Sequence, residues 1–180
     1  MNRNVFIALA ALAVFCGCGG RAGLKTGKTA ADDPYARLAA ELTAGGRALG
    51  SGKVAVLPFA CSDQRFSGEG QTVADNLGAA LAAGGGMQVL EQGLVRQALS
   101  GAGLAPSAAL SPAAIKDLGV RLGAAAIVTG ALIPRSDGSM AVKARLIATG
   151  TVSILTAADT VLPPAGAAAP GGQSAGVLIK

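Results

Sequence analysis

The most restrictive feature of the sequence is the continuous apolar run AAIVTGAL at residues 125–132. A run of this kind is typical of a β-strand that is covered on both of its faces. A turn signal, Ser136-Asp137-Gly138, follows it, and residues 139–147 (SMAVKARLI) then alternate. In that second segment apolar side chains alternate with Lys143 and Arg145, which predicts a strand with one face in water. The chain is therefore expected to build a sheet with buried and half-exposed strands side by side.

Helix signals frame these strands. Asp33-Pro34 has the pattern of an N-cap followed by proline at the first helical position, and Ser111-Pro112 repeats it. The predicted elements in chain order are a helix from 34 to about 45, a strand at 53–59, a helix through 73–81, a strand at 87–91, helices around 94–99 and from 112, and strands at 125–132, 139–147 and about 151–161. Early alternation favours parallel βαβ units, and the last three strands favour an antiparallel meander. We predict an α/β fold, a single mixed sheet of about five strands flanked by helices.

Composition limits what such a domain can do. The chain has 180 residues, which suits one domain with tails, and its hydrophobic fraction of 51% is mostly alanine. A core of small side chains buries little area per residue, so we expect modest stability. There is no histidine, which removes the commonest general base and metal ligand. The net charge of +5 is scattered along the sequence, so nucleic acid is not an expected partner.

The N-terminus explains two of the three cysteines. Residues 5–15 are apolar and too short to span a bilayer, as in the h-region of a signal peptide. The sequence Phe15-Cys16-Gly17-Cys18 resembles the end of a bacterial lipoprotein signal, although leucine is usual where Phe15 stands. This resemblance implies that Cys18 is lipidated and that residues 1–17 are removed. A plain signal peptide, or a metal or redox pair of cysteines, are the alternatives. Gly19 in place of aspartate favours the outer membrane.

The rest of the chain divides around the predicted domain. Residues 18–31 are rich in glycine and basic, and we interpret them as a flexible tether. The domain is expected to span residues 32–162. Residues 163–180 contain mostly Ala, Gly and Pro and are predicted to be a disordered tail.

Candidate chemistry is sparse. Residues 46–53 (GRALGSGK) miss a glycine of the phosphate-binding loop and precede a strand instead of following one, so no such loop is expected.

Cys61 is the one cysteine left after cleavage, either buried and inert or paired between molecules. Asp63 and Glu69 share a loop that is predicted to be solvated, with a cation site as the alternative. No activated nucleophile is present, so we predict no catalytic, cofactor or metal residues and no enzyme. Lys143 and Arg145 are read as a wet sheet face or, alternatively, as a partner-binding patch.

Several motifs carry a resemblance between residues 36 and 162. VAVLPF at the first strand, MQVLEQGLVRQAL, LGVRLGAAAIVTGAL and VKARLIATGTVSILTAA resemble the α/β domain at the N-terminus of TolB. The group that shares this domain includes the FlgO family, the CsgG family and lipoprotein activators of penicillin-binding proteins. The predicted helix at 33–45 and the single-domain lipoprotein layout are most similar to FlgO. Ala148 departs from the group, where an acidic residue often precedes Thr-Gly.

The resemblance implies a non-enzymatic outer-membrane lipoprotein that faces the periplasm and supports assembly of an envelope machine. FlgO-like proteins support flagellar assembly or motility, so a flagellar basal body is the first partner expected. The alternatives are activation of a peptidoglycan synthase and a CsgG-like role in secretion. Activators usually have a long tether, whereas fewer than about 20 residues reach only some 60–70 Å here. The resemblance leaves oligomeric state open.

Overall fold

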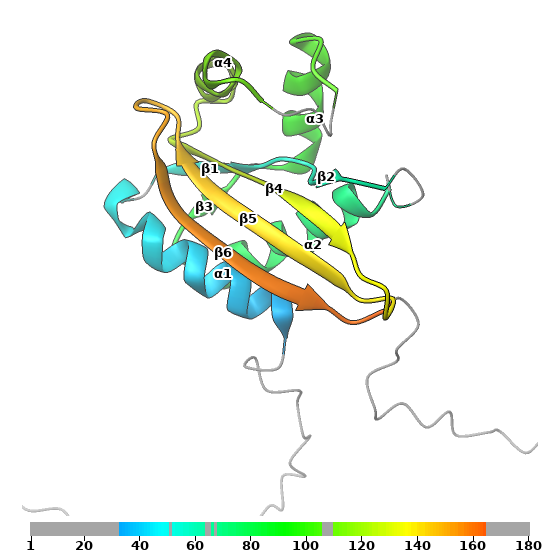
Figure 1. Ribbon diagram of the computed structural model, residues 1–180. Helices are drawn as coiled ribbons and strands as arrows, with labels where there is room; N and C mark the ends of the chain where they lie inside the picture. The colour runs from blue at the N-terminus through cyan, green and yellow to red at the C-terminus, as the bar shows by residue number, and fades with distance from the viewer. Residues whose placement is uncertain (1–32, 51, 64–65, 67, 106–109, 165–180) are drawn as a thin grey trace, which may run out of the picture.

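The computed structural model describes residues 33–164, apart from residues 51, 64–65, 67 and 106–109 (Figure 1). The predicted signal peptide with Cys18, the tether and all but the first two residues of the predicted tail lie outside this part. Within it, no helix is long and apolar enough to cross a membrane. The boundaries predicted for the domain, residues 32 and 162, stay a prediction.

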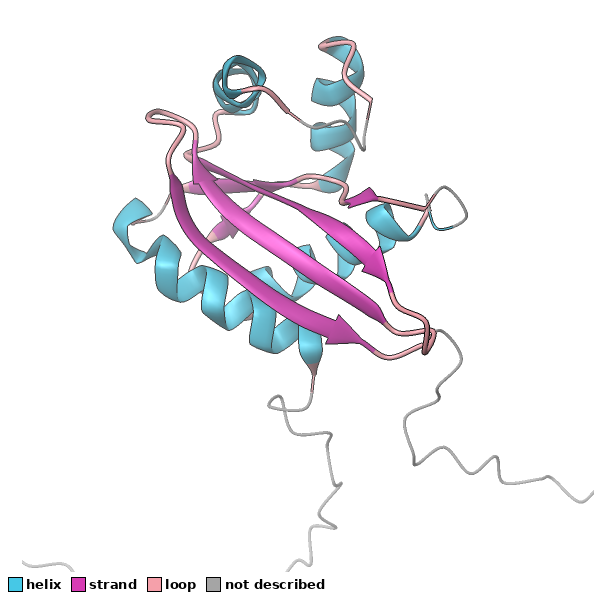
Figure 2. Cartoon of the chain, viewed as in Figure 1, coloured by secondary structure: helices cyan, strands magenta, loops and turns pink. Residues whose placement is uncertain are grey.

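One mixed sheet of six strands forms the centre of the domain (Figures 1 and 2). The strands are β1 (Lys53–Val56), β2 (Ala60–Cys61), β3 (Gln88–Val89), β4 (Ala126–Pro134), β5 (Met140–Ala148) and β6 (Ile154–Leu162). Their order is β3-β1-β4-β5-β6, and β2 also pairs with β4. The first four strands run parallel where they pair, and β4, β5 and β6 are antiparallel. The predicted fold class is confirmed, with one strand more than expected.

Four α-helices flank the sheet. They are α1 (Pro34–Gly45), α2 (Glu69–Ala83), α3 (Gln92–Gly101) and α4 (Pro112–Leu122), and a 3-10 turn, η2 (Gly46–Leu49), follows α1. Both predicted caps are confirmed: the Asp33 carboxylate accepts a hydrogen bond from the amide of Tyr35 at 3.1 Å, and the Ser111 hydroxyl accepts one from the amide of Ala114 at 3.2 Å. Because η2 precedes β1, residues 46–53 do not form a phosphate-binding loop.

The sheet separates two apolar cores. Val54 and Val56 face α1 and α2, whereas Ala55 and Leu57 pack with side chains of α3 and α4. This alternation buries β1 on both sides. β5 behaves differently, because Val142, Ala144 and Leu146 enter the core beneath α1 and α2, and only Ile147 near its end joins the core of α3 and α4. The side chains between them, Lys143 and Arg145, are exposed, as the alternating sequence predicted.

Pro58 divides the first predicted strand. A single strand was predicted at 53–59, but β1 ends at Val56 and β2 begins at Ala60. Proline has no amide hydrogen for a ladder, and the next amide, that of Phe59, donates instead to the carbonyl of Gly70 in α2 at 3.1 Å. Cys61, predicted to be either buried and inert or paired between molecules, lies in β2 as a free and only half-buried cysteine.

The predicted last strand begins later than expected. It was predicted from residue 151, but β6 starts at Ile154 because residues 149–153 form a loop. Val152 in this loop has a φ of 54°, a left-handed conformation that does not continue a strand. The loop is closed by a hydrogen bond from the amide of Ala148 to the carbonyl of Ser153, 2.9 Å long.

Candidate functional site

One face of the three-stranded antiparallel part of the sheet is largely uncovered. α1 and α2 cover its back, and α3 and α4 lie over one end of its front (Figures 1 and 2). The apolar run at 125–132 was predicted to be covered on both faces, and this is wrong for its second half. Ala126–Val128 are buried, but Thr129, Gly130 and Ala131 are only half-buried. Periodicity describes the strand but does not show how far the neighbouring helices extend over it.

We call this surface the open face. It is defined by the residues of β4, β5 and β6 that point away from α1 and α2, namely Thr129, Ala131, Ile133, Ala141, Lys143, Arg145, Ala157, Asp159 and Val161. Residues that are paired across antiparallel strands share a face, which fixes this set. Ile133 and Val161 are 40% and 43% exposed, and Ile154 at the start of β6 is 57% exposed. Three of the five large apolar side chains exposed in the described residues therefore lie on or beside the open face.

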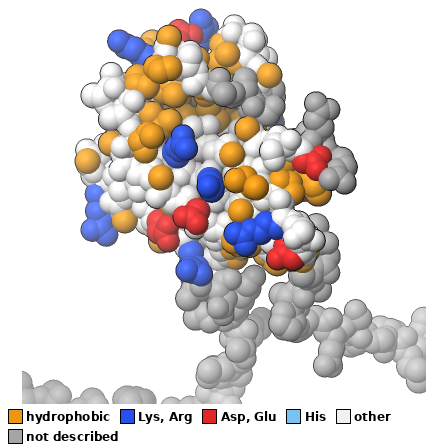
Figure 3. All heavy atoms as spheres, in the orientation of Figure 1, with side chains coloured by type: hydrophobic (Ala, Val, Ile, Leu, Met, Phe, Trp, Pro, Cys, Tyr) orange, Lys and Arg blue, Asp and Glu red, His pale blue; other side chains and the backbone are white. Residues whose placement is uncertain are grey.

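Two cations stand in the middle of the open face. Lys143 lies opposite Asp159 in the β5–β6 register, whereas Arg145 lies between the uncharged Thr129 and Ala157. In the described part of the chain neither the Lys143 nor the Arg145 side chain makes a hydrogen bond or ion pair. Figure 3, in the same orientation as Figure 1, shows basic side chains in the middle of this face with hydrophobic ones around them. The sequence identified both cations but not their apolar surroundings.

A cavity of about 320 Å³ opens beside the two cations. It lies where the open face meets the front helices, and Lys143 and Arg145 belong to its rim. Pro58, from the connection between β1 and β2, Leu110, just before α4, and Ile115, in the first part of α4, form an apolar wall. Nothing in the sequence indicated this cavity, because its wall is assembled from segments that are far apart along the chain.

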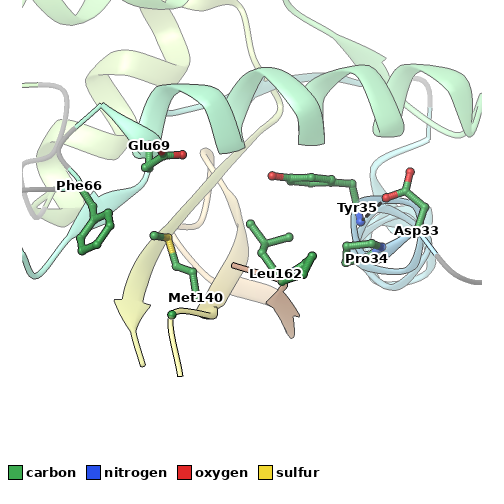
Figure 4. A pocket seen from close by; sticks show the side chains of 9 residues that line it. Asp33, Pro34, Tyr35, Phe66, Glu69, Met140 and Leu162 are labelled. Atoms are coloured by element: carbon green, nitrogen blue, oxygen red, sulfur yellow. Dashed lines mark hydrogen bonds between the residues drawn. The ribbon is translucent and has the colours of Figure 1, made fainter. Parts of the chain in front are cut away.

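A second cavity, of about 300 Å³, lies at the far end of the sheet (Figure 4). The side chains of Tyr35, Met140 and Leu162 form its apolar centre, and Glu69 lies on the opposite side from Asp33. The Asp33 carboxylate is occupied as the cap of α1. This cavity therefore combines an apolar centre with carboxylates at its edges.

The cation site considered at Asp63 and Glu69 finds no support among the described residues. Glu69 is the first residue of α2. No group of three or more His, Cys, Asp or Glu side chains that could hold a metal occurs among the described residues. The open face, which combines two cations, exposed apolar side chains and a cavity, is therefore the stronger candidate site.

No protein-family model matches the chain, and no curated protein matches it. Several solved structures do match the chain in fold. The structure of LpoB from Escherichia coli has a TM-score of 0.57 at 10% identity, covering 86% of this chain and 83% of that one. The LpoB C-terminal domain from Salmonella enterica has a TM-score of 0.53 at 14% identity, covering 69% and 94%. Lipoprotein GNA1162 from Neisseria meningitidis has a TM-score of 0.53 at 17% identity, covering 67% and 86%.

These comparisons show the fold. The matches cover most of both chains in each case, so the similarity concerns the whole domain. The predicted mixed α/β sheet flanked by helices is the architecture that this protein shares with the LpoB domains.

Proposed function

We propose that this protein is a lipid-anchored, non-enzymatic envelope protein that binds a peptidoglycan synthase and raises its activity. The observation that carries the proposal is the fold shared with the LpoB domains over most of the chain. LpoB belongs to the lipoprotein activators of penicillin-binding proteins, one branch of the group that the sequence resembles. That branch was the alternative to the flagellar interpretation, and the structural likeness now favours it.

The open face supports a binding role. Ile133 and Val161 expose apolar surface on the same sheet face as the cavity, and a protein partner can cover the apolar side chains and the cavity at once. Among the described residues, no hydrogen bond joins a nucleophile to a base on this face. An activator needs only to bind its synthase and bias its conformation, so the absence of histidine from the chain is no obstacle.

The flagellar proposal has less support. It rests on the sequence resemblance to FlgO, and none of the three similar structures is a FlgO protein. A CsgG-like role in secretion likewise rests on the sequence resemblance alone. A deletion strain separates the flagellar role from the proposed one: normal swimming together with altered cell-wall synthesis supports the activator role, and loss of swimming with normal wall synthesis supports the flagellar one.

The predicted tether limits where the synthase would be bound. At about 3.5 Å per residue, the 14 residues predicted as the tether reach at most about 50 Å from the outer membrane. The synthase would therefore have to extend a domain of its own toward the outer membrane. Lengthening the tether with a Gly-Ser insertion is expected to leave activation unchanged, and shortening it is expected to reduce activation in cells but not in detergent solution.

The direct test measures synthase turnover. Full-length protein in detergent is added to each purified peptidoglycan synthase of the source organism, and glycan-strand polymerisation and cross-linking are followed. An increase with one synthase is expected. Ala131→Arg, which places a long side chain on the open face, is expected to abolish the increase, whereas the control Ala40→Arg on the exposed side of α1 is not. Unchanged turnover with every synthase would refute the proposal.

A further inference from the structure

The open face has a specific recognition element at Arg145. We propose that Arg145 and the cavity beside it bind a protein segment that carries an Asp or Glu carboxylate next to a bulky apolar side chain. The carboxylate would bind the guanidinium group, and the apolar side chain would enter the cavity. This binding mode rests on the proposed function, because it specifies how the open face would hold its partner.

Arg145 is suited to this role because its donors are unused. The side chain is exposed and makes no hydrogen bond or ion pair within the described residues. A guanidinium group presents a planar set of N–H donors that matches a carboxylate in a two-bond geometry. Lys143 is less suited, because Asp159 lies directly opposite it and weakens its field. Arg145 faces no carboxylate across either neighbouring strand, since its partners there are Thr129 and Ala157.

The cavity supplies the apolar half of the site. Its volume of about 320 Å³ is sufficient for one large side chain, and Pro58, Leu110 and Ile115 offer it a hydrocarbon wall. Arg145 belongs to the same rim, so both contacts fall within one small area. A buried aromatic or aliphatic anchor beside a charge-assisted hydrogen bond is the usual composition of an interface hot spot. Neighbouring Ile133 and Val161 would then lie in the surrounding apolar zone.

A membrane surface fits these features less well than a protein. Lys143 and Arg145 less Asp159 leave a net charge of only +1 on the open face. Attraction to anionic lipid headgroups grows with the number of basic residues near the surface, so this charge contributes little. A walled cavity also favours a single inserted side chain over a flat lipid layer. The protein segment is therefore the occupant that we propose.

The test selects binding peptides without assuming the partner's identity. A phage-displayed library of random peptides is selected on the full-length protein in detergent. The expected consensus contains Asp or Glu adjacent to Phe, Tyr, Trp or Leu. The affinity of a consensus peptide is expected to fall at least tenfold with Arg145→Glu and less with Arg145→Lys. The control Arg96→Glu, at an exposed position of α3, is expected to leave it unchanged.

A charge exchange completes the test. A consensus peptide with its acidic residue replaced by Lys is expected to regain affinity for the Arg145→Glu protein. Several results would overturn the inference: a consensus without acidic residues, affinity insensitive to Arg145→Glu, binding to vesicles of phosphatidylethanolamine and phosphatidylglycerol that depends on Arg145, or concentration-dependent self-association that Arg145→Glu abolishes. The last two would identify a lipid surface or a second copy as the occupant.

The synthase assay separates this inference from the proposed function. If the wild-type protein raises synthase turnover and the Arg145→Glu protein raises it to the same extent, the proposed function stands and the inference about Arg145 is wrong. If no synthase responds but acidic-apolar peptides bind through Arg145, the inference stands and the partner is another protein.

Discussion

Thr149 provides a quantitative test of the motif that closes the antiparallel part of the sheet. Its side chain is 8% exposed, and its hydroxyl donates to the carbonyl of Ala124 at 2.7 Å and lies 3.1 Å from that of Ala125. The amide of Thr149 also donates to the Ala125 carbonyl at 3.0 Å. The end of β5 is thus fastened to the start of β4, and the Thr-Gly pair of the sequence resemblance has a structural reason.

Replacing Thr149 with Val keeps the shape and removes the hydroxyl. The Ala125 carbonyl keeps its backbone partner, but the buried Ala124 carbonyl loses the hydroxyl as its donor. An unsatisfied buried carbonyl costs about 1–3 kcal/mol, so the free energy of unfolding should fall by that amount. Thr149→Ser keeps the hydroxyl and loses one methyl group against Gly119, which costs about 0.8 kcal/mol. Both losses are a fraction of the roughly 5–15 kcal/mol typical of a domain, so both variants should fold.

Urea unfolding followed by circular dichroism measures these differences, with equal m-values as the condition for comparing them. Thr151→Val is the matched control, because its exposed hydroxyl bonds only with that of Ser153 and its loss should change stability by less than about 0.5 kcal/mol. If Thr149→Val were as stable as the wild type while Thr149→Ser were destabilised, packing and not hydrogen bonding would explain the Thr-Gly motif, and our reasoning would be wrong.

Three further predictions concern single residues. Gly123 ends α4 with a φ of 58°, so Gly123→Ala should lower the free energy of unfolding by about 1–2 kcal/mol, and an unchanged urea midpoint would contradict this. Hydrogen bonds from the Ser139 hydroxyl and amide hold the pKa of Asp137 below its ordinary value; this carboxylate therefore stabilises the protein above the ordinary pKa and ceases to do so as pH falls through the lowered one. Asp137→Asn should flatten that acid-side decline in the urea midpoint, and an identical pH profile would count against it. Cys18→Ser should abolish palmitate labelling and membrane attachment, whereas Cys16→Ser should not; labelled Cys18→Ser protein would refute lipidation at Cys18.

The sequence predicts the elements of this fold well where local chemistry determines them. The caps at Asp33 and Ser111 depend on their own neighbours, and the alternation around Lys143 depends on one strand, so each was predictable. β2 was missed because it is two residues long and exists only through its pairing with β4. The half-burial of Cys61 follows from that pairing and could not be inferred from the residues around it.

The candidate site was predictable only in part, for a related reason. The sequence showed that Lys143 and Arg145 share an exposed strand face, but it did not show which apolar residues of β4 and β6 would join them. That requires the register, which places Ala131 beside Lys143 and Asp159 on its other side. The cavity depends in addition on where α4 and the segment around Pro58 pack.

Strand length gives the open face its physical origin. β4, β5 and β6 each have nine residues, about 30 Å, whereas β1 has four, about 13 Å. α3 and α4 pack with Leu57 and Ile127, so they cover the front of the sheet only near β1. The rest of the antiparallel strands extends beyond them and is left without a helix. A sheet face exposed in this way and carrying only polar side chains would be inert, but this one exposes Ile133 and Val161. Its Arg145, which has no hydrogen-bond or ion-pair partner among the described residues, lines a cavity. The domain thus leaves uncovered a surface that another protein can complete, which is the property that the proposed activator role requires.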